Sequence, residues 1–330
     1  EFRIKYGVQA AQRRYSQEPS FLNSILLLKH YFASHLEMHW YGYMLWLLCV
    51  MDVVYCGAAK SCSSMTSRPW RKTHIGIVAG DPGRNSQFFC NGFQTEVIEQ
   101  SISWANRYAA GAIFFLDEMN SGTTAAFIGW FGVSNIDKVE EIMHRIYCPI
   151  HGLGRESRKY AADRKDMYRT LVIGCDNNRQ VMECLEPNVY FIANGKSNTI
   201  VACPRYFFHH GVVASRNKEI KSKVLWNSQR QHLDTAGFAL LHELTHIPAL
   251  VGGFEHWENN RSAKDLAYNP SECIHLPDKD KLNNANNYAL FALEVRANTE
   301  FARMLVDMGG DARSISESAK HLLTNGSLWN

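Results

Sequence analysis

Two histidines spaced four residues apart, His242 and His246, are the feature that most restricts how this chain can fold. They lie at the end of an apolar stretch with helical periodicity. Asp234 or Thr235 can cap a helix there, because short polar side chains accept hydrogen bonds from the N–H groups of a first turn. The sequence therefore predicts a helix over residues 236–246 that carries both histidines.

This predicted helix gives the two imidazoles a common direction. Positions i and i+4 share one helix face, so His242 and His246 can bind the same metal ion. Glu243 follows the first histidine and projects beside that ion, where its carboxylate can accept a proton from a water activated by the metal. Zinc suits the pattern, since it accepts imidazole nitrogen and lowers the pKa of bound water to about 7. The segment is typical of zinc-dependent hydrolysis of peptide bonds.

The metal needs a third protein ligand, and the residues alone leave several candidates. One large class of such enzymes has a histidine six residues after the second ligand. That position holds Gly252 here, which excludes the class. A carboxylate from a second helix is an alternative, and Glu294 would supply it. The other candidates are Asp265, which a tyrosine follows closely, and His256.

Composition indicates a globular protein without a strongly charged partner. The 330 residues are 46% hydrophobic and 20% charged, with a net charge of +3. So small an excess of positive charge favours neither nucleic acid nor an anionic membrane as the main partner. We expect a monomer that acts on protein or peptide substrates, with no nucleic-acid partner and no stable membrane association.

The N-terminal part indicates export. Residues 38–59 include an apolar stretch that ends in small residues, and Asp52 interrupts it too early for a comfortable bilayer span. We expect a signal peptide here, or alternatively an anchor that keeps the protein at a membrane. Residues 1–37 have no assigned role, and residues 60–89 are expected to be a linker or short pro-segment. A secreted, extracellular zinc metallopeptidase domain would then cover residues 90–330.

Nine cysteines fit an exported protein. Cys49 and Cys56 would leave with the signal peptide, and Cys62 lies in the serine-rich stretch behind it. None of the other six has the Cys-x-x-Cys spacing of a structural zinc site, so we expect up to three disulfides among them. These six are Cys90, Cys148, Cys175, Cys184, Cys203 and Cys273.

The spacing of apolar residues predicts an α+β fold that is mostly helical with a small antiparallel sheet. Short β-rich runs lie in the middle of the chain between turn signals, and helical segments flank them. Besides the helix with the two histidines, helices are expected over residues 94–116, 136–147 and 285–308. Strands are expected over residues 168–174, 189–193 and 199–204.

Three sequence blocks resemble the aspzincins, the deuterolysin-like zinc metallopeptidases. That family pairs H-E-[LM]-T-H with G-T-x-D-x-x-Y-G and then has a stretch like N-N-A-D-x-Y-A-L-F-A. The matching blocks here are His242-Glu-Leu-Thr-His246, Ala263-Lys-Asp265-Leu-Ala-Tyr268-Asn269 and Asn283-Asn-Ala-Asn-Asn-Tyr288-Ala-Leu-Phe-Ala292. The resemblance covers roughly residues 88–308.

The resemblance implies a zincin-like fold with one zinc ion beside an HExxH active-site helix. It implies that His242, His246 and Asp265 bind this ion. It also implies that Glu243 is the general base of a secreted metalloendopeptidase.

Two tyrosines are candidate donors to the oxyanion of the tetrahedral intermediate, where a phenol hydroxyl stabilises most. The resemblance implies this role for Tyr268. Tyr206 lies in a segment that also resembles the family and would be a second donor. Its other interpretation is a core aromatic residue with a satisfied hydroxyl.

The second block departs from the family pattern. Its leading Gly-Thr is Ser262-Ala263 here, and the Gly after its tyrosine is Asn269. A changed turn would move Asp265 and favours an alternative function, a secreted relative that binds zinc or peptide without catalysis. The intact Glu243 argues against this alternative, because metal binding alone does not need that carboxylate.

The third block carries an acidic pair in the lysine-specific members of the family, and Asn286 and Ala289 occupy those positions here. A pocket that lacks both carboxylates does not select a lysine ammonium strongly. We therefore predict no strict preference for Lys directly after the scissile bond. Sequencing the peptides from a denatured protein digest checks this, and products dominated by Lys at that position would contradict it.

Overall fold

The computed structural model describes residue 62 and residues 74–78, 88–153, 170–210, 216–251 and 263–324. All of them belong to the second of two units into which the chain divides, Cys56–Asn330. The unassigned residues 1–37, the predicted signal peptide or anchor over residues 38–59, and His256 lie outside the described residues.

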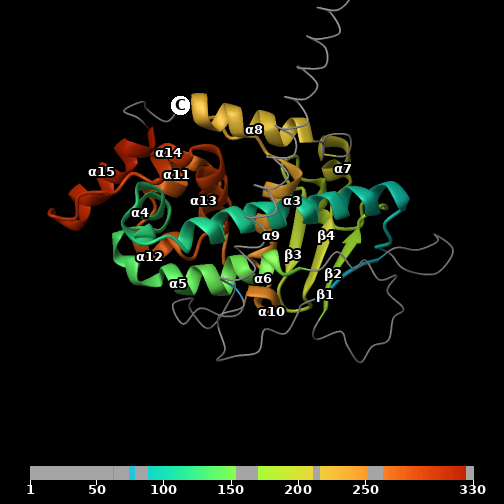
Figure 1. Cartoon of the computed structure of the whole chain (residues 1–330). Helices are drawn as coiled ribbons and strands as arrows, with labels where there is room; N and C mark the ends of the chain where they lie inside the picture. Colours follow the sequence, from blue (N-terminus) through green and yellow to red (C-terminus); the bar gives the residue numbers. More distant parts are fainter. Residues whose placement is uncertain are drawn as a thin grey trace, which may run out of the picture. The chain divides into compact units, whose positions relative to one another are not determined.

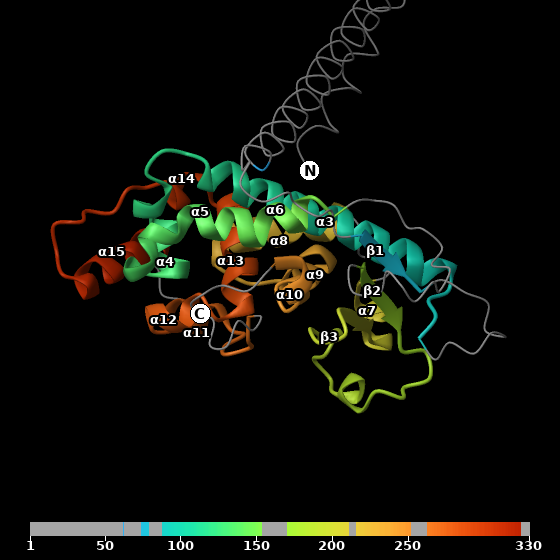
Figure 2. The same ribbon diagram turned by 90° about the horizontal axis from the view of Figure 1, so that it is seen from below.

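The described unit is mostly helical with one small sheet, which confirms the α+β prediction (Figure 1). The sheet lies toward one end of the long helix α3 (Gly92–Leu116), and α4 (Ala125–Phe131) lies toward the other. Helix α9 (Ala236–Leu244) lies between them and packs on α3, on α13 (Ala285–Ala297) and on strand β3 (Phe191–Asn194), as Figure 2 shows from below. The helix with the first histidine is therefore surrounded by the other elements.

Shorter helices connect and cover these elements. None of the helices in the described ranges is both long and apolar enough to cross a membrane. The other α-helices are α5 (Val139–Ile142), α6 (Cys148–His151), α7 (Pro204–His210), α8 (Arg216–Gln229), α10 (Pro248–Val251), α11 (Pro270–His275), α12 (Asp278–Lys281), α14 (Thr299–Ala302) and α15 (Ala312–Thr324).

The sheet is mixed, so the prediction of an antiparallel sheet was wrong. Its strand order is β1-β2-β4-β3, and β1 (His74–Ile77), β2 (Thr170–Cys175) and β4 (Thr199–Ala202) are parallel. Only β3 is antiparallel to its neighbour β4, to which a tight turn connects it. Strand β1 lies within residues 60–89, the segment expected to be a linker or pro-segment, and its polar surroundings in the sequence give no sign of a strand.

Helix α3 confirms the prediction for residues 94–116. Its first turn is closed by a capping box, in which Asn91 accepts from the N–H of Gln94 and the side chain of Gln94 accepts from the N–H of Asn91. Its apolar positions are buried in the core, among them Ile98, Ala105 and Ile113. The helix thus supplies a rigid surface on which α9 packs.

Two other predicted helices are interrupted. The segment predicted as a helix over 136–147 is helical but irregular, with a π-turn at Met143–Tyr147 directly before Pro149. The N–H of Cys148 donates to the carbonyl of Met143, five residues earlier, as in a π-turn, and Pro149, the next residue, has no N–H to continue the regular helical pattern. The block predicted over 285–308 ends at Ala297, because Asn298 leaves the helical conformation.

Three disulfides connect the described elements, which confirms the expected number but not the expected set. Cys273 was expected to be paired, but it forms no disulfide and is buried, with its thiol donating to the carbonyl of Ala267 (3.3 Å). Cys62 takes part instead. The pairs are Cys62–Cys148, Cys90–Cys175 and Cys184–Cys203.

Helix α9 is held at its start by polar contacts and by a close approach to α3. Thr235 caps the helix, and the N–H of Gly237 donates to the buried carboxylate of Glu219 (3.3 Å). Tyr108 of α3 donates to the same carboxylate (2.6 Å). A Cβ atom on Gly237 would lie 2.4 Å from Cβ of Trp104, so only glycine permits this spacing between α3 and α9.

We predict that Gly237→Ala destabilises the protein, because the added methyl group forces α9 away from α3. The expected loss in the free energy of unfolding is about 1–3 kcal/mol, measured by urea denaturation. Gly92→Ala is the matched control, since no atom lies within 4 Å of a Cβ at that position. Equal stability of Gly237→Ala and wild type would contradict the close packing of the two helices.

Candidate metal centre

Helix α9 ends at Leu244, two residues before the predicted end, so His246 lies in the turn that follows it. The N–H of Thr245 donates to the carbonyl of His242, and the N–H of His246 donates to the carbonyl of Glu243; both distances are 3.1 Å. These contacts between residues three apart continue the helical direction through a tighter turn. The Nε2 atoms of His242 and His246 consequently lie only 3.3 Å apart. The common direction predicted for the two imidazoles is confirmed.

Asp265 approaches the histidines from a segment that lies along the start of α13. The N–H of Lys264 donates to the carbonyl of Asn283 (2.7 Å), and the N–H of Ala285 donates to the carbonyl of Lys264 (2.9 Å). This pair of backbone hydrogen bonds places Asp265 directly below the two histidines.

The side chain of Asn284 fixes the same segment from the other side. Its Oδ1 accepts from the N–H groups of Leu266 (2.9 Å) and Ala267 (3.2 Å), and its Nδ2 donates to the carbonyl of Ala267 (3.1 Å). Asn284 is fully buried. At least one asparagine of the third sequence block, Asn284, therefore has a structural role: it holds the segment that contains Asp265. The sequence alone did not predict this role.

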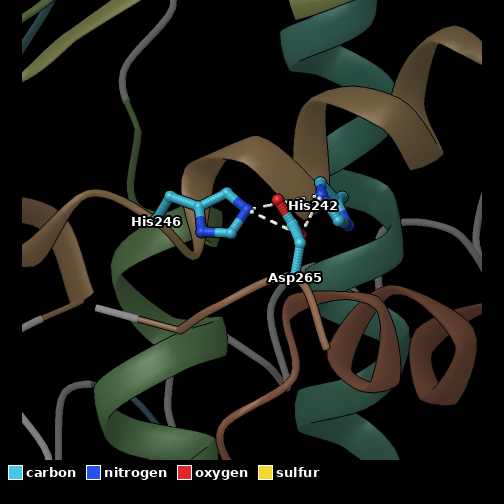
Figure 3. Close-up of side chains that lie close together, drawn as sticks. All are labelled: His242, His246 and Asp265. Atoms are coloured by element: carbon cyan, nitrogen blue, oxygen red, sulfur yellow. Dashed lines mark hydrogen bonds and ion pairs between the residues drawn. The ribbon is translucent and has the colours of Figure 1, made fainter. Parts of the chain in front are cut away.

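Three side chains converge on one point (Figure 3). Oδ1 of Asp265 lies 3.1 Å from Nε2 of His242 and 3.2 Å from Nε2 of His246. Glu294, the alternative third ligand, is elsewhere: it is buried in an ion pair with Arg230 (2.9 Å) and accepts from the indole N–H of Trp226 (3.1 Å). Of the two carboxylates that the sequence proposed, only Asp265 joins the histidines.

The outer nitrogen of each imidazole has its own acceptor. Nδ1 of His246 donates to the backbone carbonyl of Ala263 (2.7 Å). Nδ1 of His242 contacts Oδ1 of Asn286 (3.2 Å). Such contacts orient metal-binding histidines and direct the lone pair of Nε2 toward the metal. Neither contact could be inferred from the motif.

The spacing of the three donor atoms fits a small metal ion. A tetrahedral ion with bonds of about 2.0–2.1 Å, the range of zinc, separates its ligand atoms by about 3.3–3.4 Å. The three separations here are 3.1, 3.2 and 3.3 Å. His242, His246 and Asp265 therefore form a donor set that can hold one metal ion.

Charge is already balanced within this cluster. Burial lowers the pKa of His246, but the hydrogen bond to Asp265 and the nearby carboxylates outweigh it and raise the pKa to about 9. Burial raises the pKa of Asp265, but the hydrogen bonds from both imidazoles hold it well below its ordinary value. A metal ion binding here would displace the proton of His246 and take over its interaction with the carboxylate.

Glu243 lies beside the donor set without being part of it. Its Oε1 is 4.0 Å from Nε2 of His242, and its side chain is 15% exposed. Burial raises the pKa of Glu243, although the two imidazoles and a hydrogen bond from the backbone of Ala193 lower it. A carboxylate whose pKa is shifted toward neutrality and that lies in a cavity is suited to accept and return a proton.

Tyr268 lies at the edge of the cluster and is 62% exposed. Its ring stacks on His242 with centroids 6.0 Å apart, and its hydroxyl is hydrogen-bonded to Asp265. Burial and the charge of Asp265 raise its pKa, so the hydroxyl stays protonated and remains a donor.

Tyr206 occupies a different place. It is fully buried, packs on Phe191 with ring centroids 4.1 Å apart, and shares a short hydrogen bond with Ser101. It does not line the cavity that contains the cluster. The structure thus brings Tyr268 to the two histidines and leaves Tyr206 in the core.

A cavity of about 1180 Å³ contains the cluster in its wall. Residues 186–193, which include the first three residues of strand β3, form one side, and residues 229–232 and 268–271 form others. The disulfide Cys184–Cys203 ties the first of these segments to the end of β4. A cavity of this volume has room for several residues of a peptide.

Comparison with known proteins agrees with the geometry. A protein of Arthroderma otae named "Probable neutral protease 2 homolog" is 26% identical over 205 residues, 62% of this chain and 44% of that protein. A Trichophyton verrucosum protein of the same name and a "Neutral protease 2 homolog" of Arthroderma gypseum are each 32% identical over 101 residues, 29% of this chain. The aligned parts of these two are 25% and 24% of their own lengths. No family model matches the chain.

The chain thus spans less than half the length of these curated relatives. These relatives are named as proteases, and the similarity supports the family resemblance noted in the sequence.

We predict that Asn284→Ala both destabilises the protein and weakens metal binding, because it leaves the N–H of Leu266 and the buried N–H of Ala267 without their acceptor. The expected loss is about 1–3 kcal/mol in the free energy of unfolding. Urea denaturation measures the first effect and competition with a zinc chelator the second. Asn283→Ala is the control, since within the described ranges that side chain bonds only to an exposed carbonyl of Lys279. Unchanged metal affinity in Asn284→Ala would refute this support of Asp265.

Proposed function

We propose that this chain is a secreted, zinc-dependent endopeptidase in which His242, His246 and Asp265 hold one zinc ion and Glu243 is the general base. The zinc-like spacing of the three donor atoms, beside a mostly buried carboxylate, carries the proposal. Similarity to neutral protease homologues supports peptide bonds as the substrate. A zincin-like role for α9, as the active-site helix, belongs to the same proposal.

Zinc bound here would lower the pKa of a water molecule and polarise the carbonyl of the scissile peptide bond. Glu243 accepts the proton that this water loses during attack, and it donates a proton to the leaving amine afterwards. Its raised pKa makes the carboxylate a stronger base toward the attacking water. The protonated carboxyl group can still pass its proton on, because the leaving amine is a stronger base than a carboxylate.

Tyr268 completes the site as a hydrogen-bond donor. Its hydroxyl lies beside Asp265 and remains protonated, so it can donate to the oxygen that becomes negatively charged in the transition state. Such a donor is worth about 10²–10³-fold in kcat in other hydrolases. We assign no catalytic step to Tyr206, since its hydroxyl is in the core.

Strand β3 suits the backbone of an extended peptide. It is the last strand of the sheet and lines the cavity. The backbone of Ala193 bonds to Glu243, so the edge of β3 that faces away from β4 is turned toward the end of α9. A substrate segment added along this edge would be held by main-chain hydrogen bonds, which do not depend on its sequence.

The disulfide bonds support secretion. The three disulfides of the described cysteines are typical of proteins that leave the reducing cytosol. The signal peptide or anchor over residues 38–59 remains a prediction from the sequence.

The main alternative is a secreted relative that binds zinc or peptide but no longer catalyses. Its motivation was the altered turn around Asp265, and Ala263 and Asn269 do flank the donor there. The Asp265 carboxylate nevertheless lies within 3.2 Å of both imidazoles. Because the altered turn has not moved this ligand away, the distance favours the catalytic function over the binding function.

We predict that the full chain hydrolyses an unfolded protein substrate and that a zinc chelator abolishes this activity. Glu243→Gln is expected to lower kcat by about 10²–10⁴-fold, since the amide cannot accept the proton of water. The variant should still bind one zinc ion, measured by atomic absorption. Hydrolysis that survives both the chelator and the substitution would refute the proposed function. Stoichiometric zinc without hydrolysis by wild type would favour the binding protein.

A further inference from the structure

We infer that Asn286 is a positioning residue for the metal centre: one end of its amide fixes the tautomer of His242, and the other end holds the backbone of Tyr268. This inference rests on the proposed function, in which His242 binds the metal and Tyr268 donates to the oxyanion. In the sequence, Asn286 occupies a position where the lysine-specific members of the resembled family carry an acidic residue.

The hydrogen bonds of Asn286 determine which way its amide points. Its Nδ2 donates to the backbone carbonyl of Tyr268, which can only accept. The sulfur of Cys273, 3.8 Å from the same Nδ2, lies on that side as well. The amide oxygen must therefore face Nδ1 of His242, 3.2 Å away.

This orientation settles which nitrogen of the neutral His242 ring carries the proton. Because the amide oxygen is an acceptor without a proton, Nδ1 of His242 has to be the donor. In the neutral imidazole, which is the form that binds a metal, the lone pair is then on Nε2, the atom that faces His246 and Asp265. A histidine with the opposite tautomer would present an N–H group to the metal and could not bind it.

Asn286 is well placed to impose this arrangement. It is 4% exposed and lies in the first turn of α13, which packs on α9. The same side chain thus contacts the helix that carries one metal ligand and the loop that carries Asp265 and Tyr268. Its two functions need different chemistry, because one contact requires an acceptor and the other a donor.

Two substitutions separate the functions. Asn286→Leu has a similar volume but offers neither donor nor acceptor, so it releases His242. Asn286→Asp keeps the acceptor for His242, but it places a carboxylate oxygen against the carbonyl of Tyr268. Asn283→Leu is the control, because Asn283 lies on the same segment and, among the described residues, its side chain bonds only to the exposed carbonyl of Lys279.

The experiment measures zinc affinity by chelator competition, together with kcat on an unfolded protein substrate and urea denaturation of the metal-free proteins. For Asn286→Leu we expect zinc affinity to fall by about 10–100-fold, the usual effect of losing such a contact. For Asn286→Asp we expect zinc affinity at or above that of wild type, with kcat lowered by about 10–100-fold as Tyr268 shifts. Asn283→Leu should match wild type in both.

Wild-type zinc affinity in Asn286→Leu would overturn the inference and leave the proposed function intact. Equal loss of zinc affinity in Asn286→Leu and Asn286→Asp would also overturn it, because the acceptor would then not matter. Failure of the wild-type chain to bind zinc would instead overturn the proposed function, and this inference with it. If Asn286→Leu fails to fold, the opposite changes of affinity and kcat in Asn286→Asp still test it.

Discussion

The metal centre depends on the hydrogen bonds by which the start of α13 holds the Asp265 segment against the end of α9. The two histidines come from one short stretch of chain, and their convergence needs only a turn. The carboxylate comes from a separate segment and must be held in place by tertiary contacts. Asn284 supplies them from a fully buried position, where an unmet backbone N–H costs about 1–3 kcal/mol. The hydrogen bonds that hold the Asp265 carboxylate in place therefore also stabilise the fold.

The elements that sequence patterns predicted well are those whose signal is local. Helix α3 has a capping box and a long apolar face, and α9 has a capping threonine before an apolar run. The mixed sheet depends instead on a long-range partner, since β1 pairs with β2, which is about a hundred residues later in the chain. No local sequence pattern predicts which distant strands pair with each other. The disulfide of Cys62 likewise depends on a partner far along the chain, Cys148.

The same distinction applies within the site. The motif identified His242, Glu243 and His246, and the family resemblance identified Asp265 and Tyr268; the structure brings all five together. The groups that hydrogen-bond to these residues and hold them in place could not be predicted from the sequence, for two reasons. A backbone carbonyl, such as that of Ala263, has no signature in a sequence. Asparagines at the start of a helix, such as Asn284 and Asn286, are ordinary there and gain their meaning only from the segment packed against them.

The most direct test of this account is zinc K-edge X-ray absorption of the zinc-loaded full chain, compared with Asp265→Ala. The account predicts two imidazole nitrogens and light oxygen ligands at about 2.0–2.2 Å, with no sulfur, and an altered or lost site in the variant. Sulfur scattering at about 2.3 Å, or a spectrum that Asp265→Ala leaves unchanged, would contradict the assignment of His242, His246 and Asp265 as the metal ligands.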